Sequence, residues 1–191
     1  MKPTYNIFIA GVGGQGILLA GELLCLAVME CGHDAKKSEV HGMAQRGGSV
    51  TSHVRFGPKV FSPLIPEGEA DILMAFEALE ALRWGGFLRK GGKVLVNRQE
   101  IMPTTVTSGR MRYPDDIYDR IRKKHPGTRV VDGLELAGRT GDVRTVNSVL
   151  LGAVSRELDV PEKVWRKVIT RYLPERFVSM NLKAFELGRG L

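Results

Sequence analysis

A short apolar segment followed at once by a glycine-rich turn constrains this chain more than any other part of the sequence. Tyr5–Ala10 has the composition of a buried strand, and residues 17–31 have the pattern of a long helix that ends before Gly32. Between them lies Gly11-Val12-Gly13-Gly14-Gln15-Gly16, which matches the pattern G-x-G-x-x-G. A strand, a glycine turn and a helix in this order are typical of α/β folds in which the turn approaches a phosphate.

Each glycine of this turn has a physical reason in a phosphate-binding interpretation. The first allows a tight turn, the second lets a phosphate approach the backbone, and the third lets helix and strand pack closely. The exposed N–H groups and the dipole of the helix favour negative charge. The alternative is a tight strand-to-helix turn that binds nothing. The ligand-facing candidates are Gly11, Gly13, Gly14, Gln15 and Gly16.

A nicotinamide dinucleotide is one ligand that this pattern suggests. Such a site also needs an acid at the end of the second strand to hold the ribose. Glu39 stands at about that place, but Lys36 and Lys37 precede it and His41-Gly42 follow. These neighbours favour a phosphate or an acidic partner over a neutral ribose diol. A free-standing NAD(P)-dependent oxidoreductase therefore stays as the alternative function.

A second glycine cluster, Gln45-Arg46-Gly47-Gly48-Ser49, lies between the predicted strands 34–40 and 50–56. The Arg46 guanidinium suits phosphate or carboxylate, and Gly47 and Gly48 would let a ligand come close. A flexible turn with a solvated arginine is the alternative. Because ligands gather at the carboxyl ends of strands in α/β sheets, both clusters are predicted to share one crevice.

The rest of the chain alternates between strand and helix patterns. Further strands are predicted at 70–76, 93–97 and 128–131, and helices at 77–88 and 115–124, whereas 98–109 has no clear pattern. An apolar stripe from Val146 to Leu158 and helices after Pro161 and near Phe177 close the chain. The prediction is a Rossmann-like three-layer α/β/α fold with a mostly parallel sheet and a helical C-terminal part.

The stiff, apolar segment from Ser62 to Gly68 contains two prolines and allows two interpretations, a packing lid over the sheet or a docking surface. Asn97, Asn147 and Asn181 are predicted to be helix caps or structural hydrogen-bonding residues.

Charge and cysteine content exclude several functions. The net charge of +7 favours acidic ligands or partners, but the basic run 120–124 lacks interleaved aromatics. That run is therefore predicted to be a solvated helix face, and nucleic acid is not expected as a partner.

Two cysteines are too few for an iron–sulfur cluster, and four scattered histidines have no zinc spacing. No signal peptide or membrane span is recognisable, so we expect a cytoplasmic chain without a metal. No nucleophile–base pair stands out, and catalytic residues stay unknown.

Taken together, these motifs resemble those of the gamma-type subunit of 2-oxoacid:ferredoxin oxidoreductases. The resemblance implies that residues 1–191 form a single gamma-type catalytic domain of that family. The resemblance rests on the glycine turn, on residues 38–48 with Val54-Arg55, on 62–71, and on Asn147 with Leu151-Gly152-Ala153. The version Glu-Val-His-Gly-Met-Ala-Gln-Arg-Gly-Gly is most similar to the beta subunit of indolepyruvate ferredoxin oxidoreductases.

This resemblance implies a chain that is inactive alone and belongs to a heteromeric complex acting on the oxo group of a 2-oxoacid, with an iron–sulfur protein as acceptor. The complex decarboxylates an aryl 2-oxoacid to an acyl-CoA and passes electrons to ferredoxin. Thiamine diphosphate and 4Fe–4S clusters are expected on a larger partner subunit. The gamma-type domain is expected to help bind coenzyme A, with Arg46 neutralising charge.

Overall fold

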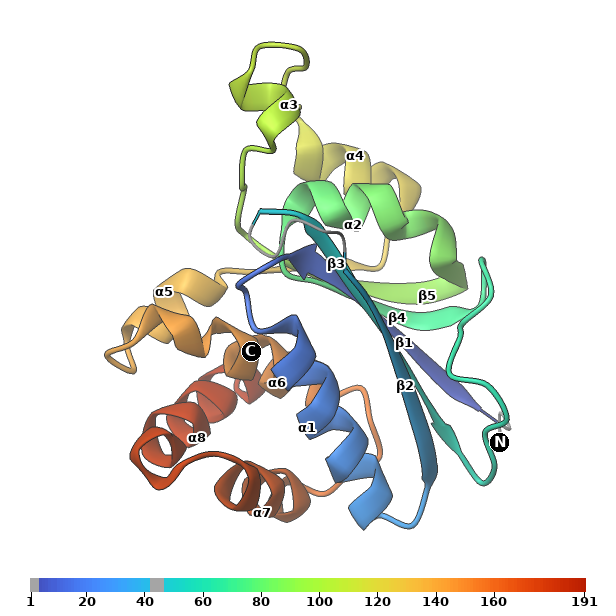
Figure 1. Cartoon of the computed structure of the whole chain (residues 1–191), viewed down its shortest axis with the longest axis vertical. Helices are drawn as coiled ribbons and strands as arrows, with labels where there is room; N and C mark the ends of the chain where they lie inside the picture. Colours follow the sequence, from blue (N-terminus) through green and yellow to red (C-terminus); the bar gives the residue numbers. More distant parts are fainter. Residues whose placement is uncertain (1–3, 42–46) are drawn as a thin grey trace.

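The computed structural model describes residues 4–41 and 47–191, and one mixed sheet forms its centre (Figure 1). The strand order is β2-β3-β1-β4-β5-β6. The strand bounds are β1 Tyr5–Val12, β2 Asp34–His41, β3 Ser49–Gly57, β4 Ala70–Ala75, β5 Leu88–Asn97 and β6 Thr128–Val131.

Strands β1, β4, β5 and β6 pair in parallel, which confirms the mostly parallel sheet predicted from the sequence. Strand β3 runs antiparallel between β1 and β2, with Val12 opposite Ser49 at one end and Tyr5 opposite Phe56 at the other. The carboxyl ends of β1 and β2 therefore lie at the same edge of the sheet as the amino end of β3. This carboxyl edge is where the two glycine clusters meet.

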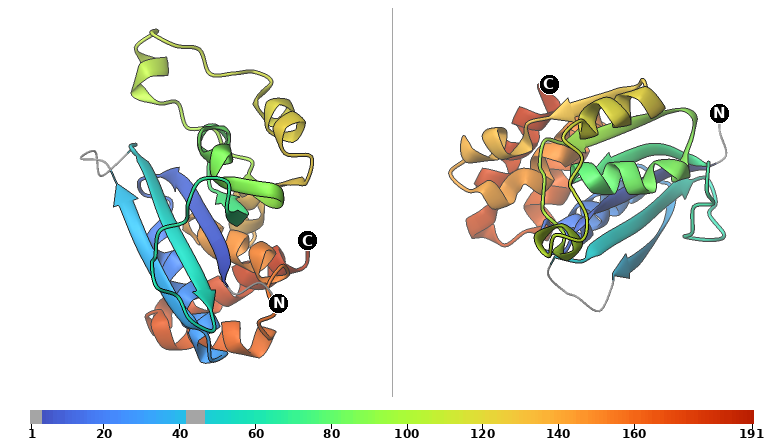
Figure 2. Two further views of the ribbon diagram at one scale, coloured as in Figure 1. Left: turned by 90° about the vertical axis from the view of Figure 1, so that its right-hand side faces the viewer. Right: turned by 90° about the horizontal axis from the view of Figure 1, so that it is seen from above.

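Helices cover both faces of the sheet, as the three-layer prediction required (Figures 1 and 2). Ile7 and Ile9 of β1 pack into a core with one group of helices, and Phe8 and Ala10 pack into a second core on the opposite face. The first group is α1 Ile17–Glu30, α5 Gly133–Gly138, α6 Val146–Ser155, α7 Glu162–Tyr172 and α8 Glu175–Arg189; the second is α2 Ala78–Trp84 and α4 Ile117–Lys124. Strict alternation of side chains along a strand produces this division.

Two glycines bring the C-terminal helices into backbone contact. A Cβ added at Gly152 of α6 would overlap the carbonyl oxygen of Phe185, and a Cβ added at Gly188 of α8 would overlap that of Val149. Because glycine has no side chain, α6 and α8 approach more closely than larger residues allow. Helices α6 and α8 thereby form a closely packed pair in the core that also contains Ile7 and Ile9 of β1.

The proline-containing segment between β3 and β4 packs on the sheet through its backbone. Val60 N donates to Asp34 Oδ2 at 2.9 Å, and Ile65 N donates to His53 Nδ1 at 3.0 Å. Within Ser62–Gly68, Ile65 is buried, so the packing interpretation holds for that residue, whereas Leu64 is 54% exposed. Just before the segment, Val60 is also buried and Phe61 is 89% exposed.

Among the described residues, no helix has both the length and the apolar character needed to cross a bilayer.

Candidate functional site

The glycine turn stands at the carboxyl edge, between the end of β1 and the start of α1. Gly11 is still part of β1, and a Cβ there would lie 2.8 Å from both Ile17 Cδ1 and Phe76 Cβ, so only glycine fits. Gly14 has φ +102° and is exposed. Gly16 is the N-cap of α1 with φ +79°, a conformation that favours glycine.

Helix α1 begins without a side-chain cap and without an acidic residue in its first turn. The N-terminal N–H groups of a helix carry partial positive charge, which attracts an anion unless a side chain satisfies them. An uncapped start next to a glycine turn is therefore the arrangement that binds pyrophosphate in α/β folds.

The side chain of Gln15, a predicted ligand-facing residue, lies folded into the protein. Its Oε1 accepts a hydrogen bond from Val12 N at 2.7 Å, and its Nε2 donates to Phe76 O at 3.0 Å and to Gln99 Oε1 at 2.9 Å. Gln15 thus holds the glycine turn against the ends of β4 and β5, and its side-chain amide is engaged within the protein.

The two glycine clusters meet at the carboxyl edge, as predicted. Gly13 N donates to Gly48 O at 2.9 Å, and Gly47 has φ +77° and is exposed. Ser49, which follows Gly48, donates its hydroxyl hydrogen bond to Glu80 Oε2 of α2, and the same oxygen also accepts from Trp84 Nε1 at 3.0 Å. Arg46, the predicted charge-neutralising residue, lies outside the described residues.

Asn97 and Asn181 have the structural hydrogen-bonding roles predicted for them, and Asn147 Oδ1 accepts from Ser148 N at 2.9 Å without capping α6. Buried Asn97 accepts from Gly133 N at 3.0 Å at the start of α5 and donates to Phe76 O at 3.2 Å. Asn181 donates to Phe177 O and accepts from the Ser148 hydroxyl.

Asn147 of α6 lies against the glycine turn. A Cβ added at Gly16 would be 2.9 Å from Asn147 Nδ2. This contact brings together two motifs whose residues Gly16 and Asn147 are 131 positions apart in the sequence.

Glu77, the N-cap of α2, is a buried carboxylate that sequence reasoning missed. Its Oε1 accepts from the Tyr113 hydroxyl at 2.6 Å and from Ile101 N at 3.2 Å, and its Oε2 accepts from Glu80 N at 2.9 Å. Burial raises the pKa of Glu77, and these hydrogen bonds oppose that rise. The only sequence signal was its place directly after an apolar strand.

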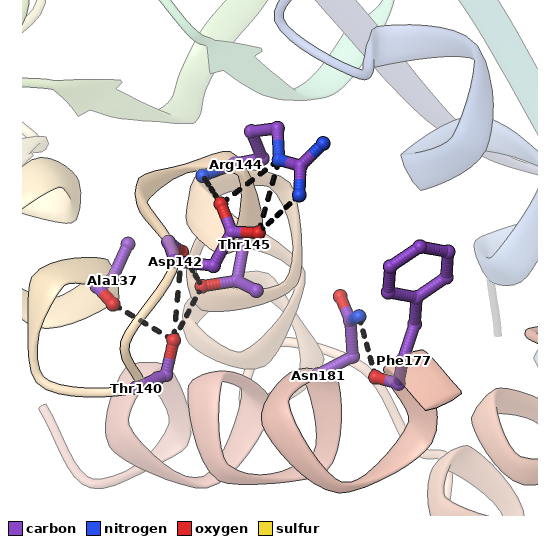
Figure 3. A network of polar contacts seen from close by, with 7 residues as sticks. All are labelled: Ala137, Thr140, Asp142, Arg144, Thr145, Phe177 and Asn181. Atoms are coloured by element: carbon purple, nitrogen blue, oxygen red, sulfur yellow. Dashed lines mark hydrogen bonds and ion pairs between the residues drawn. The ribbon is translucent and has the colours of Figure 1, made fainter. Parts of the chain in front are cut away.

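A polar network precedes α6 and presents an exposed guanidinium (Figure 3). Thr145 Oγ1 lies 2.9 Å from Thr140 Oγ1 and donates to Asp142 O at 2.7 Å, which fixes the turn. Arg144 Nη2 donates to Asp142 Oδ2 at 2.6 Å, yet its side chain is 80% exposed. The hydrogen bonds from Arg144 lower the pKa of Asp142 to about 2.

Arg144 stands three residues before Asn147, the residue that touches Gly16. Asn147 was singled out in the sequence, whereas Arg144, three residues earlier, was not. A guanidinium held by one carboxylate keeps further donors for an anion.

Neither cysteine is suited to be a nucleophile. Burial raises the pKa of the Cys25 thiol to about 12, and burial also raises that of Cys31. In the part of the chain that the structure describes, His, Cys, Asp and Glu side chains do not gather in threes that could hold a metal ion.

The comparisons with known proteins show the family of the chain. Residues 6–191 match the family model described as pyruvate ferredoxin/flavodoxin oxidoreductase. The chain is 42% identical over 189 residues to indolepyruvate oxidoreductase subunit IorB of Thermococcus kodakarensis and 43% identical over 190 residues to that of Pyrococcus horikoshii; each match covers 96% of this chain and 94% of the relative.

Among solved structures, the chain is similar to the gamma subunit of a keto/oxoacid ferredoxin oxidoreductase from Geobacter sulfurreducens. The TM-score is 0.70 at 26% identity, and the match covers 96% of this chain and 95% of that one. The chain belongs to the pyruvate ferredoxin/flavodoxin oxidoreductase family. The family resemblance drawn from the sequence motifs is thereby confirmed.

Proposed function

We propose that this chain is the gamma-type subunit of an indolepyruvate:ferredoxin oxidoreductase, with residues 1–191 as its single domain. Relatives with more than 40% identity along nearly their whole length carry the indolepyruvate oxidoreductase name. The complex converts an aryl 2-oxoacid and coenzyme A to an acyl-CoA and carbon dioxide, and two electrons pass to ferredoxin. We place this complex in the cytoplasm.

Thiamine diphosphate and the iron–sulfur clusters belong, in this proposal, to a larger partner subunit. Thiamine diphosphate supplies the stabilised carbanion for decarboxylation when it is bound there. The low number of cysteines in this chain, two, supports placing the clusters on the partner subunit, since a cluster usually takes four thiolates. This chain by itself is then inactive, and its contribution is to bind and to position.

One observation carries the binding role: the uncapped start of α1, beside the glycine turn at the carboxyl edge of the sheet. Coenzyme A contains a pyrophosphate and a ribose phosphate. The backbone at Gly14 and Gly16 would receive the pyrophosphate with the help of the α1 dipole, whereas Gly13 N already donates to Gly48 O and joins the two glycine clusters. Gly11 and Gln15 shape the turn from within, and Gly47 and Gly48 border it.

Two arginines would neutralise the remaining phosphate charge. Arg144 presents its exposed guanidinium three residues before Asn147, which touches the turn. Arg46 directly precedes Gly47 and Gly48 in the sequence. Guanidinium groups bind phosphate through paired hydrogen bonds, and both arginines are assigned to coenzyme A because Arg144 stands close along the chain to Asn147 and Arg46 to the second glycine cluster.

The NAD(P) alternative has less support from the geometry. In dinucleotide-binding folds the second strand along the chain lies beside the first, which brings its terminal acid to the ribose. Here β3 separates β2 from β1, and Glu39 forms an ion pair of 2.7 Å with Lys37. Calorimetry should detect no binding of NAD(H) or NADP(H) to the isolated chain; saturable binding would favour the alternative.

The coenzyme A role is tested on the assembled complex with Arg144→Gln and Arg46→Ala. Each variant should raise KM for coenzyme A about tenfold while leaving KM for the 2-oxoacid unchanged. Arg139→Gln is the matched control, because Arg139 is also exposed and paired with one carboxylate, Glu135. An unchanged KM for coenzyme A in both variants would contradict the assignment. Failure of the Arg46 variant to assemble would make Arg46 an interface residue instead.

A further inference from the structure

Residues 101–114, called the arm here, project beyond the sheet and its helices at the carboxyl edge. Figures 1 and 2 show the arm, with the short helix α3 Thr104–Thr107, extending away from α2 and α4. It has its own backbone hydrogen bonds, from Met111 N to Thr105 O at 3.0 Å and from Gly109 N to Val106 O at 2.9 Å. The arm is therefore a shaped element and not a simple connection.

One buried carboxylate holds both ends of the arm. Glu77 Oε1 accepts from Ile101 N at its start and from the Tyr113 hydroxyl near its end. Just before the arm, Gln99 Oε1 accepts from Gln15 of the glycine turn and from Asn97 Nδ2 at 3.1 Å. The base of the arm is thus fixed to the proposed coenzyme A site, whereas its tip stands in solvent.

The surface of the arm is apolar and basic. Met102 is 47% exposed and Met111 is 63% exposed, and both Arg110 and Arg112 are exposed. Residues 101–114 contain these two arginines and no Asp or Glu. Within the described residues, neither arginine forms an ion pair, unlike Arg120 and Arg122 of α4, which pair with Asp116 and Asp119.

This chemistry selects the kind of partner. Exposed methionines adapt their shape to an apolar groove, and arginine is enriched at protein interfaces. Unpaired positive charge at the rim of an interface favours an acidic partner and steers its approach. A second copy of this chain fits poorly, because each copy carries a net charge of +7 and an arm with two positive charges.

We propose that the arm is the docking element of this subunit, and that it enters an apolar groove with an acidic rim on the larger subunit of the complex. The inference rests on the proposed function, because that function supplies the partner. Docking through the arm places the partner against the carboxyl edge, where the glycine turn lies. Glu77 and Gln99 are then positioning residues that align the arm with that edge.

The test is the affinity of the purified chain for the purified larger subunit, measured by biolayer interferometry. The variant Arg110→Glu with Arg112→Glu should bind at least about tenfold more weakly than the natural chain. The control Lys163→Glu with Lys183→Glu makes the same change of charge, from +7 to +3, on α7 and α8 and should bind within about twofold. Near 1 M salt, where the Debye length is about 3 Å, the difference between the two variants should shrink.

Hydrogen exchange gives a second measurement that does not depend on substitution. Amides of residues 101–114 should become protected when the larger subunit is added. Equal affinities of the arm variant and the control, or an arm that exchanges as fast in the complex as alone, would overturn the docking proposal. Absence of binding by the natural chain would instead overturn the proposed function, and the docking proposal with it.

Discussion

Gln15 Nε2 donates a hydrogen bond of 2.9 Å to Gln99 Oε1, and this bond joins the glycine turn after β1 to the segment that leads into the arm. The same Gln15 amide accepts from Val12 N and donates to Phe76 O, so both its oxygen and its nitrogen are engaged by other residues of the chain. The carboxyl edge is therefore held together by the side-chain amides of Gln15, Asn97 and Gln99.

Replacing Gln15 should destabilise the protein, because its side chain joins the glycine turn to Phe76 and Gln99. Gln15→Met keeps the length of the side chain but removes its hydrogen bonds, which should lower the free energy of unfolding by about 1–3 kcal/mol. Gln15→Glu should be worse at neutral pH, because the carboxylate would face the acceptor oxygens of Phe76 and Gln99. Denaturant unfolding measures both; equal stability of all three proteins would contradict this role for Gln15.

Alanine at the helix contact should be costly. Gly152→Ala or Gly188→Ala would force α6 and α8 apart, because the new methyl group would overlap a backbone carbonyl of the other helix. A loss of about 3 kcal/mol or more is expected for either variant. Gly138→Ala is the control, since a Cβ there meets nothing within 4 Å and its φ is not positive; it should be neutral or slightly stabilising. Thermal unfolding of the three variants would detect the difference.

Acid should weaken the packing of the proline-containing segment through His53. Burial is the main cause that lowers the pKa of His53, with the nearby Arg55 adding to it. The unfolded chain therefore binds more protons than the native chain once the pH falls below about 6.5. The stabilising contribution of His53 is present above that pH and is lost as the pH falls through the lower native pKa.

His53→Asn should remove part of this pH dependence, because an amide oxygen can accept the Ile65 N–H without titrating. The comparison is thermal unfolding of both proteins from pH 8 to pH 5. His125, whose pKa burial also lowers, is the same in both and cancels. Parallel curves for the two proteins would show that His53 does not titrate on unfolding.

Tyr113→Phe should destabilise the protein in a pH-dependent way. The variant removes a donor from buried Glu77, whose pKa burial already raises, and so raises that pKa further. In the native variant, Glu77 then stays protonated up to a higher pH than it does in the unfolded chain. The variant therefore loses stability as the pH rises above about 4.5. The loss at pH 7 should be about 1–3 kcal/mol and smaller at pH 4.

Tyr118→Phe is the matched control, because the buried Tyr118 hydroxyl has no hydrogen-bond partner among the described residues. Removing that hydroxyl should cost little or stabilise the protein. Urea unfolding at both pH values separates the outcomes, and an equal effect of the two variants would contradict the anchoring role of Glu77.

The sequence was sufficient to predict the glycine turn, its strand and its helix, because local periodicity and glycine spacing determine them. It also predicted that Gly13 and Gly48 belong to one edge, since the carboxyl ends of strands carry the loops that bind ligands. The insertion of antiparallel β3 between β1 and β2 depends on tertiary pairing, and no local pattern encodes it.

Other features were hidden by their composition. Strand β5 begins at Leu88, whereas the sequence predicted a start at Lys93. The first half of the strand was missed because it contains charged residues and the Gly91-Gly92 pair, and because its pairing with β4 shifts register there. Helix α5 was missed since it spans only six residues and begins and ends with glycine. The inward orientation of Gln15 could not be predicted either, because its partners Phe76 and Gln99 are distant in sequence.

The most direct test of the account is reduction of ferredoxin by indolepyruvate and coenzyme A, measured with the isolated chain, with the larger subunit, and with both combined. The account predicts turnover only when both subunits are present, and no turnover when coenzyme A is left out. Turnover by the isolated chain, or equal turnover by the larger subunit with and without this chain, would contradict it.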